Sequence, residues 1–233
     1  MSEDAVQKWL PALISAAVLG VFAIIGSTLV GLSHEGTVER IAQNERDALL
    51  RQMAAVLPQH RYDNDLLKDL IELHAPDALG DTPTKVYRAR KNGEDVAAIF
   101  SPVTTPGYAG DIVLLVGIYT DGSVAGVRVV THRETPGLGD KIEVKRHPWI
   151  TSFAGKSLGN PSEDRWGVKR DGGQFDQFTG ATITPRTVVA AVKRTLKYFH
   201  VHREQIFART VRATSTETAQ AGKYTNDRAS GHG

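Results

Sequence analysis

A threonine-rich stretch, QFDQFTGATITPRTVVAAV (174–192), brings several hydroxyl groups to the start of an expected helix. Gly180 and Ala181 stand directly before Thr182 and have almost no side chain. The backbone there can approach a bulky group, and glycine can adopt angles that are closed to other residues. The Thr182 hydroxyl is therefore expected to be unhindered.

The residues that follow Thr182 resemble a helix start. Thr184 is expected to be the N-cap and Pro185 the first helical residue, because threonine oxygens cap free N–H groups and proline suits that position. The unpaired N–H groups and the dipole at such a helix end stabilise an anion. A phosphate ester on Thr182 would suit this setting. On local physics alone, an ordinary glycine-containing turn before a capped helix is the simpler explanation.

Other kinds of chemistry have little support. The chain has no cysteine, which excludes disulfides, thiolate catalysis and iron–sulfur ligation. His200 and His202 are two residues apart, so on a helix they point in different directions, and we expect no metal site. Thr182 has no nearby base that would make it an acyl-transfer nucleophile. A net charge of +2 gives no reason to expect nucleic-acid binding, and no dinucleotide fingerprint is present.

An uncharged apolar run, residues 9–33, precedes the rest of the chain. As a helix it would be roughly 37 Å long, which is enough to cross a hydrocarbon core of about 30 Å. It is longer than the apolar part of a typical signal peptide, so we expect an uncleaved transmembrane anchor. Lys8 lies before the run and Glu35 after it, a weak bias that favours a cytoplasmic N-terminus.

The middle of the chain predicts an antiparallel sheet. From Lys85, strand-like segments flank Asn92-Gly93 and then Asp121-Gly122, and both dipeptides tolerate the positive φ angles of tight hairpins. The fold class that these patterns predict is α+β, an antiparallel sheet with packed helices, preceded by one N-terminal transmembrane helix.

Further elements flank this sheet. Helical spacing predicts helices over 38–57 and 65–73, and another from Pro185 whose apolar stripe packs on the sheet. A third hairpin is expected to turn at 171–173. The polar, glycine-rich segment 210–233 predicts a disordered tail.

Two motifs carry a resemblance to a known family. Residues 176–182, Asp-Gln-Phe-Thr-Gly-Ala-Thr, match the Asp-x-x-Ser/Thr-Gly-Ala-Thr pattern at which flavin transferases attach FMN in the RnfG and NqrC family. Residues 132–141, HRETPGLGDK, resemble the Glu-Thr-Pro-Gly-Leu-Gly loop with which that family lines its flavin. The resemblance covers about nine-tenths of the chain and includes the 107–110 turn. The sequence TGATITP and the modest length are more similar to RnfG than to NqrC.

The first motif implies a set of site roles. Thr182 would carry FMN covalently through a phosphoester, and Thr179 would be a hydrogen-bonding neighbour. Gly180 and Ala181 would provide clearance. Asp176 would belong to the pattern that the transferase recognises.

The second motif implies further contacts. Thr135, Gly137, Leu138 and Gly139 would approach the flavin, with Leu138 as an apolar contact and the glycines offering backbone N–H groups. Glu134 would either hydrogen-bond the flavin or hold the loop. Beyond the flavin itself, the resemblance implies no catalytic residue.

The resemblance also implies a function and a location. The chain would be an electron-transfer subunit of a membrane-bound, ion-translocating Rnf complex and not a complete enzyme alone, with the other subunits and a flavin transferase as partners. It would cross the bacterial inner membrane once, with the flavin domain on the periplasmic side. Two alternatives stay open: an NqrC-type subunit of a sodium-translocating NADH:quinone reductase, and a non-redox, membrane-anchored binding module.

The expected domain organisation follows from these points. Residues 1–8 would be cytoplasmic, 9–33 transmembrane, 34–84 a helical linker, 85–209 the FMN-binding domain and 210–233 the tail. Trp149 and Trp166 could cover the flavin ring, although packing in the core is the simpler expectation for two large aromatic side chains.

Overall fold

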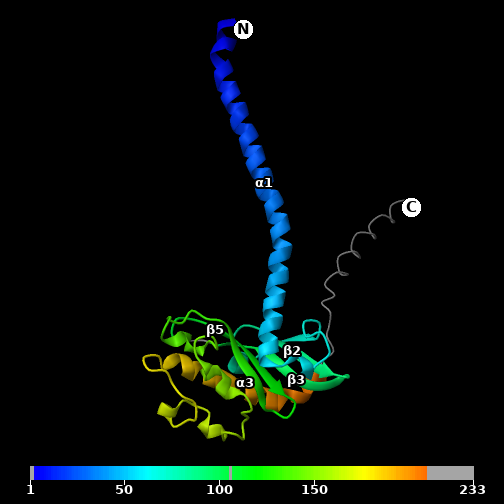
Figure 1. Cartoon of the computed structure of the whole chain (residues 1–233), viewed down its shortest axis with the longest axis vertical. Helices are drawn as coiled ribbons and strands as arrows, with labels where there is room; N and C mark the ends of the chain where they lie inside the picture. Colours follow the sequence, from blue (N-terminus) through cyan, green and yellow to red (C-terminus); the bar gives the residue numbers. More distant parts are fainter. Residues whose placement is uncertain (1–2, 105–106, 209–233) are drawn as a thin grey trace, which may run out of the picture. The chain divides into compact units, whose positions relative to one another are not determined.

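A computed structural model of the chain describes residues 3–104 and 107–208 (Figure 1). The predicted tail, 210–233, lies outside the described residues. The chain divides into two compact units, one through Arg51 and one from Gln52 onward.

The first unit is made by helix α1, Glu3–Val56, whose last turns belong to the second unit. The helices predicted over 9–33 and 38–57 are thus one continuous helix. Several large apolar side chains between Ile14 and Ile25 are at least half exposed. In the described part of the chain, no helix reaches the length and hydropathy that a bilayer crossing requires. The structure therefore does not confirm the predicted span over 9–33.

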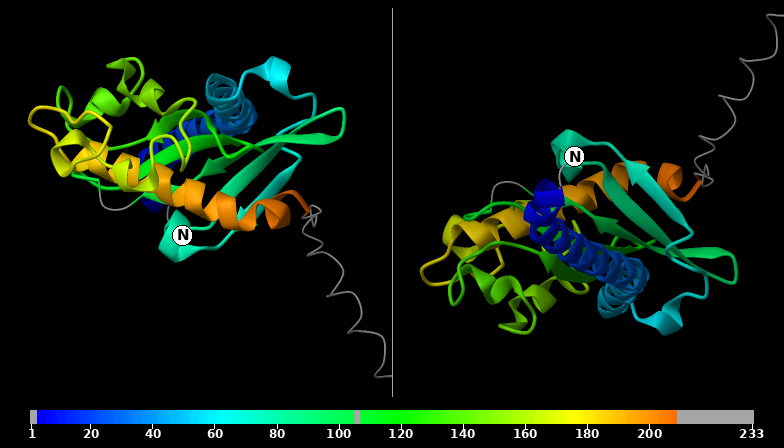
Figure 2. Two further views of the ribbon diagram at one scale, coloured as in Figure 1. Left: turned by 90° about the horizontal axis from the view of Figure 1, so that it is seen from below. Right: turned by 90° about the horizontal axis from the view of Figure 1, so that it is seen from above.

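The second unit contains an antiparallel sheet, and α3 runs along one of its faces (Figures 1 and 2). Its strands are β1 (Leu70–Leu73), β2 (Thr84–Lys91), β3 (Glu94–Ser101), β4 (Val103–Thr104), β5 (Ile112–Tyr119) and β6 (Val124–Thr131). The order is β1-β2-β3-β5, with β4 and β6 also paired to β5. The α+β class and the antiparallel sheet are confirmed.

The helices complete the unit. Among the residues that the structure describes, they are α2 (Pro76–Leu79), α3 (Ile183–Ala208) and five short 3₁₀ helices: η1 (Gln59–Arg61), η2 (Gly139–Ile142), η3 (Pro148–Phe153), η4 (Glu163–Arg165) and η5 (Lys169–Asp171). The segment that contains η2 to η5, green to yellow, lies beside the first turns of α3 (Figure 2).

The two hairpins predicted at Asn92-Gly93 and Asp121-Gly122 form, but with different turns. Asn92 and Gly93 have φ angles of 53° and 81°, as the tight β2–β3 turn requires. In the β5–β6 turn, positive φ is confined to Gly122, at 86°, and the Asp121 carboxylate accepts a hydrogen bond from the Ser123 N–H at 2.8 Å. Local turn chemistry therefore sets both reversals.

Two predicted elements are wrong. The helix predicted over 65–73 is replaced by a turn and by β1, because Leu70–Leu73 pairs with β2 in the register Leu70↔Tyr87. The hairpin predicted at 171–173 does not form. Instead, η5 ends at Asp171 with Gly172 as its C-cap, at a φ of 82°, and Val168 forms an isolated parallel bridge with Phe175. Long-range packing overrides local propensity in both places.

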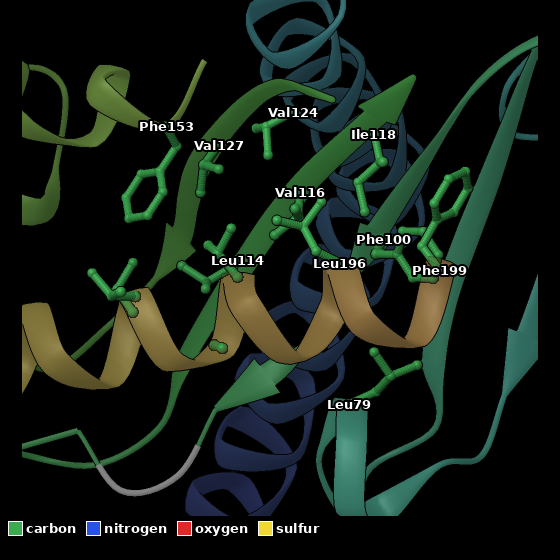
Figure 3. Close-up of a cluster of buried hydrophobic side chains, with 14 of the residues drawn as sticks. Leu79, Phe100, Leu114, Val116, Ile118, Val124, Val127, Phe153, Leu196 and Phe199 are labelled. Carbon is green, nitrogen blue, oxygen red and sulfur yellow. The ribbon is translucent and has the colours of Figure 1, made fainter. Parts of the chain in front are cut away.

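The core lies between α3 and the sheet. Leu196 and Phe199 point from α3 toward the strands (Figure 3). Fully buried partners come from β3, β5 and β6: Phe100, Leu114, Val116, Ile118 and Val127. Burying one such side chain stabilises the fold by about 1.5–3 kcal/mol. The apolar stripe predicted for the helix from Pro185 is confirmed, since Val188, Val192, Leu196 and Phe199 are buried, and it anchors α3 so that its first turn has a defined position.

The opposite face of β5 and β6 receives the last turn of α1. A Cβ added to Gly117 would lie 2.5 Å from Val56 Cγ1, and one added to Gly126 would lie 2.7 Å from the Val56 carbonyl oxygen. Val56 is 1% exposed. Gly117 and Gly126 therefore leave the space that the last turn of α1 occupies, and a side chain at either position would contact Val56 too closely.

Candidate functional site

The loop after β6 is built on a tight turn over Thr135–Leu138. The Thr135 carbonyl accepts hydrogen bonds from the N–H groups of Leu138 and Gly139, each at 3.1 Å. Pro136 and Gly137 occupy the central positions, and the φ of Gly137 is 79°, which suits a proline–glycine turn. In the structure the Gly139 N–H donates to the Thr135 carbonyl, and its contact with a bound group stays a prediction.

A second turn spans Phe178–Ala181. The Ala181 N–H donates to the Phe178 carbonyl at 3.2 Å, and Thr179 and Gly180 form the exposed corner. Gly180 has a φ of 84°. A Cβ added there would lie 3.3 Å from Leu138 Cδ2, so the leucine of the first turn lies against the glycine of the second. The two sequence motifs are thus in contact.

Helix α3 begins directly after this second turn. The Arg186 N–H donates to the Thr182 carbonyl at 3.3 Å, and the first helical residue is Ile183. Thr182 is therefore the N-cap, and the prediction that Thr184 takes this position is wrong. Thr184 lies in the first turn and is fully buried, and Pro185 follows it. The partly exposed Thr182 hydroxyl stands at the positive end of a 26-residue helix.

The first turn of α3 is also tied to η5 by an ion pair. Arg186 donates from Nε and Nη2 to the two carboxylate oxygens of Asp171, at 2.6 Å and 2.5 Å. These hydrogen bonds lower the pKa of Asp171 and raise that of Arg186. Both groups are exposed, so the pair orients the segment before α3 more than it stabilises the fold.

A buried carboxylate joins three separate segments at the site. Glu134 is 5% exposed. Its Oε1 accepts a hydrogen bond from the Ala109 N–H at 3.2 Å, and its Oε2 accepts one from the Thr184 hydroxyl at 2.5 Å. The Glu134 N–H donates to His132 Nδ1 at 3.0 Å. Glu134 thereby links the 107–110 turn, its own loop and the first turn of α3.

Two glycines leave room for this carboxylate. A Cβ added to Gly107 would lie 2.6 Å from Glu134 Oε1, and one added to Gly139 would lie 2.6 Å from Glu134 Oε2. The added Cβ at Gly139 would also lie 3.0 Å from Thr184 Oγ1. Side chains at either position would push the carboxylate away from its partners.

A pocket of about 350 Å³ opens where these segments meet. Seven of the predicted site residues line it: Glu134, Thr135, Leu138, Gly139, Gly180, Ala181 and Thr182. Its volume lies in the range typical of small-molecule sites. The prediction that the two motifs form one site agrees with this pocket.

Three further lining residues are absent from the sequence-based set. They are Tyr108, Ile183 and Thr184. Tyr108 is 69% exposed and Ile183 is 46% exposed, so the pocket has large apolar side chains at its rim. The glycines of the 107–110 turn are a signal for Tyr108. The sequence gives no signal that Thr184 lines the pocket, because its position before Pro185 also suits a helix N-cap.

The remaining predicted residues do not line the pocket. Gly137 and Thr179 shape its two turns from outside. The Asp176 side chain is exposed and pairs with Lys169 Nζ at 2.6 Å. The Asp176 carbonyl accepts a hydrogen bond from Trp149 Nε1 at 2.7 Å, which anchors the start of the motif.

The two tryptophans pack in the core. Trp149 and Trp166 are each 5% exposed, and each makes ring contacts with Phe153. Trp166 Nε1 donates to the Ser157 carbonyl at 2.9 Å. Neither ring lines the pocket, so core packing is the better interpretation of both.

A larger hollow of about 770 Å³ lies between β1 and the end of α3. Its walls include Glu72, His74, Tyr198 and His202, and none of the predicted site residues. The predicted site residues therefore gather at the smaller pocket and not at this hollow. Across residues 3–104 and 107–208, no three His, Cys, Asp or Glu side chains are grouped so that they could hold a metal ion.

Comparisons with known proteins add independent information. Residues 107–197 match a family model described as an FMN-binding domain, and residues 5–56 match one described as the RnfG N-terminal region. The pocket lies within the first match. The two matched ranges together cover most of the chain.

Several curated proteins are similar over most of their length. A protein of Pseudomonas aeruginosa (strain UCBPP-PA14), whose name makes it the G subunit of an ion-translocating oxidoreductase complex, is 48% identical over 83% of this chain and 91% of its own length. Proteins with the same name from Shewanella loihica and Aliivibrio fischeri are 45% and 42% identical, and each match covers 92% of the relative.

Proposed function

The chain belongs to the RnfG family, the G subunits of ion-translocating oxidoreductase complexes, and on that premise we propose that it carries one FMN, esterified through its phosphate to Thr182. Membership makes the chain one part of a translocase complex and not a complete enzyme. Its partners are the other subunits, and a flavin transferase attaches the FMN. The match to the RnfG N-terminal region favours this assignment over an NqrC-type subunit.

The observation that carries the proposal is the position of Thr182. Its hydroxyl belongs to the N-cap of α3 and lines the pocket in which both motifs meet. A phosphate on that oxygen would lie at the positive end of the helix dipole, near N–H groups of the first turn that have no partner within the helix. The residues present therefore fit a phosphate-linked group.

The pocket also suits a flat, largely apolar ring system. Leu138 is 42% exposed and Tyr108 is 69% exposed, and both line the pocket. Partly exposed apolar side chains at a pocket rim can cover an aromatic ring on one side. Gly180 and Ala181 give clearance beside the attachment point. Once bound, FMN would accept and return electrons, and the protein sets its position and electrostatic environment.

The other predicted residues have supporting roles in the proposal. Thr135 and Gly137 hold the turn that presents Leu138, and Thr179 lies at the exposed corner before Thr182. The exposed Asp176 side chain is accessible to a modifying enzyme, in keeping with a role in recognition.

We further propose that residues 9–33 anchor the chain in the bacterial inner membrane as a single span. Three observations support it: the absence of charge over 9–33, the helical conformation of the segment and the exposure of its large apolar side chains from Ile14 to Ile25. Water does not favour such exposure along a helix. Residues 1–8 would then be cytoplasmic, and the domain within 85–209 periplasmic.

Coexpression of the full chain with a flavin transferase tests the attachment. Intact mass and in-gel flavin fluorescence should show one FMN on the wild type and on Thr182→Ser, which keeps a hydroxyl, and none on Thr182→Val. Thr131→Val, an exposed position on β6 outside the pocket, is the matched control and should keep the FMN. Wild-type fluorescence from Thr182→Val would place the attachment at another residue.

A further inference from the structure

We propose that Glu134 is the positioning residue of the attachment site, acting through Thr184 to hold the Thr182 hydroxyl where a flavin transferase can use it. This inference rests on the proposed attachment at Thr182. It assigns to Glu134 and Thr184 a function in maturation, which is separate from any contact that they make with bound FMN.

The geometry of the helix start supports this assignment. Thr184 is two residues after Thr182, in the first turn of α3, and its hydroxyl donates to Glu134 Oε2 at 2.5 Å. Fixing Thr184 fixes the rotation of that turn about the helix axis, and with it the direction of the N-cap side chain. The Glu134 carboxylate accepts from Thr184 and Ala109, so its effect on Thr182 is indirect and passes through the first turn of the helix.

The second anchor of the carboxylate makes this position rigid. Oε1 accepts a hydrogen bond from the Ala109 N–H, and Ala109 belongs to a turn closed by the hydrogen bond from the Gly107 N–H to the Gly110 carbonyl at 2.9 Å. A carboxylate that is 5% exposed depends on both donors, because an unpaired buried charge is costly. The first turn of α3 is therefore held against two loops.

Two glycines leave the space that the carboxylate needs in this position. Gly107 and Gly139 leave space for one oxygen each, and an added Cβ would lie 2.6 Å from that oxygen in both cases. A side chain at either position would therefore displace the carboxylate from its two donors. The position of Thr184, and so of Thr182, follows from this packing.

Position matters because the transfer is a displacement at phosphorus. Thr182 Oγ1 forms a bond to the FMN phosphorus of a flavin dinucleotide, the pyrophosphate bond breaks, the nucleoside monophosphate leaves and the hydroxyl proton is released to water. Such reactions are sensitive to the alignment of the attacking oxygen. Loss of the Thr184 hydrogen bond should therefore lower kcat of the transferase for this chain and leave KM largely unchanged.

The test follows the rate of FMN attachment to full-length, unmodified chain by a purified flavin transferase with FAD, read by intact mass. Thr184→Val should reduce kcat about tenfold, the factor that the loss of one charge-assisted hydrogen bond supplies, and Thr184→Ser should restore most of it. Glu134→Met should have an effect similar to that of Thr184→Val. Glu134→Gln should be milder, because its amide can accept from Ala109 and donate to the Thr184 hydroxyl. Thr131→Val is the control.

A second measurement separates positioning from unfolding. Misfolded chain lowers the final extent of attachment, whereas a misplaced hydroxyl lowers the rate. Hydrogen exchange at Ala109 should also speed up in both Glu134→Met and Thr184→Val. If Thr184→Val and Glu134→Met are modified at the wild-type rate, the inference is wrong. If Glu134→Gln is as slow as Glu134→Met, the hydrogen bonds that the glutamine amide keeps do not set the rate, and the positioning role is wrong. If wild-type Thr182 is never modified, the proposed function itself fails.

Discussion

Gly139 and Gly137 lie two residues apart in one loop but are glycines for different reasons. Gly137 has a φ of 79° and nothing within 4 Å of an added Cβ, so alanine there would fit in space but would strain the backbone. Gly139 has no positive φ, yet an added Cβ would lie 2.6 Å from Glu134 Oε2 and 2.9 Å from Glu134 Cβ. Gly139→Ala should therefore damage the site by steric contact alone.

The two substitutions should differ in their effect on the free energy of unfolding. A left-handed backbone costs a residue other than glycine about 1–2 kcal/mol, partly offset by the lower entropy of the unfolded chain, so Gly137→Ala should cost about 1 kcal/mol. Gly139→Ala overpacks a buried contact, at about 1–3 kcal/mol, and weakens the hydrogen bond to Glu134, at about 1.5–3 kcal/mol. These contributions overlap, and we expect a total of about 3 kcal/mol.

The assay is denaturant unfolding of the purified full-length chain in mild detergent, followed by tryptophan fluorescence. Trp149 and Trp166 are buried in the second unit, so their emission reports the unfolding of the domain that holds the site. The transition midpoint of Gly139→Ala should fall well below that of Gly137→Ala, with similar slopes. FMN attachment should fall more in Gly139→Ala. Equal midpoints for the two variants, or a larger loss for Gly137→Ala, would contradict the steric explanation.

Two further predictions concern other parts of the second unit. Gly117→Ala should lower the free energy of unfolding by about 1–3 kcal/mol, because the added Cβ would clash with a side-chain atom of Val56. Val56→Ala should therefore partly rescue it. Gly126→Ala clashes with the Val56 backbone and should gain no rescue from Val56→Ala in a double-mutant cycle. Additive costs for Gly117→Ala and Val56→Ala would refute this. Hydrogen bonds from the Ser123 hydroxyl and N–H lower the pKa of Asp121, so the stability they contribute is present above the ordinary aspartate pKa and is lost as the pH falls through the native value. Thermal melts of Asp121→Asn should thus show a slightly lower melting temperature than the wild type at neutral pH, and this difference should disappear in acid. A difference in melting temperature that does not change with pH would be evidence against the turn's contribution.

Local sequence signals predicted the β2–β3 and β5–β6 hairpins and the closing helix. The Asn92-Gly93 pair determines its turn by its own backbone preferences, and the stripe along α3 follows from a single period. In contrast, β1 depends on pairing with β2, more than ten residues away, so the segment 65–73 resembles a helix when it is considered alone. The position of a strand at the sheet edge is not encoded locally.

The site also combines residues that local sequence motifs predict with a contact that depends on the fold. The two motifs identified most of the pocket residues, because each motif is contiguous in the sequence. The link between them was not predictable, since the Glu134–Thr184 hydrogen bond joins residues 50 positions apart. Thr184 also precedes proline, and local capping rules do not distinguish it from Thr182. The side chain that was hardest to assign from the sequence, Glu134, is the one that joins the most segments of the site.

The most direct test of the account is the mass of one peptide. Trypsin should release residues 171–186 from chain purified from its native membrane, and this peptide contains Thr179, Thr182 and Thr184. The peptide should be heavier by FMN less one water, with fragment ions that place the addition on Thr182. An unmodified peptide, or an addition on Thr179 or Thr184, would contradict it.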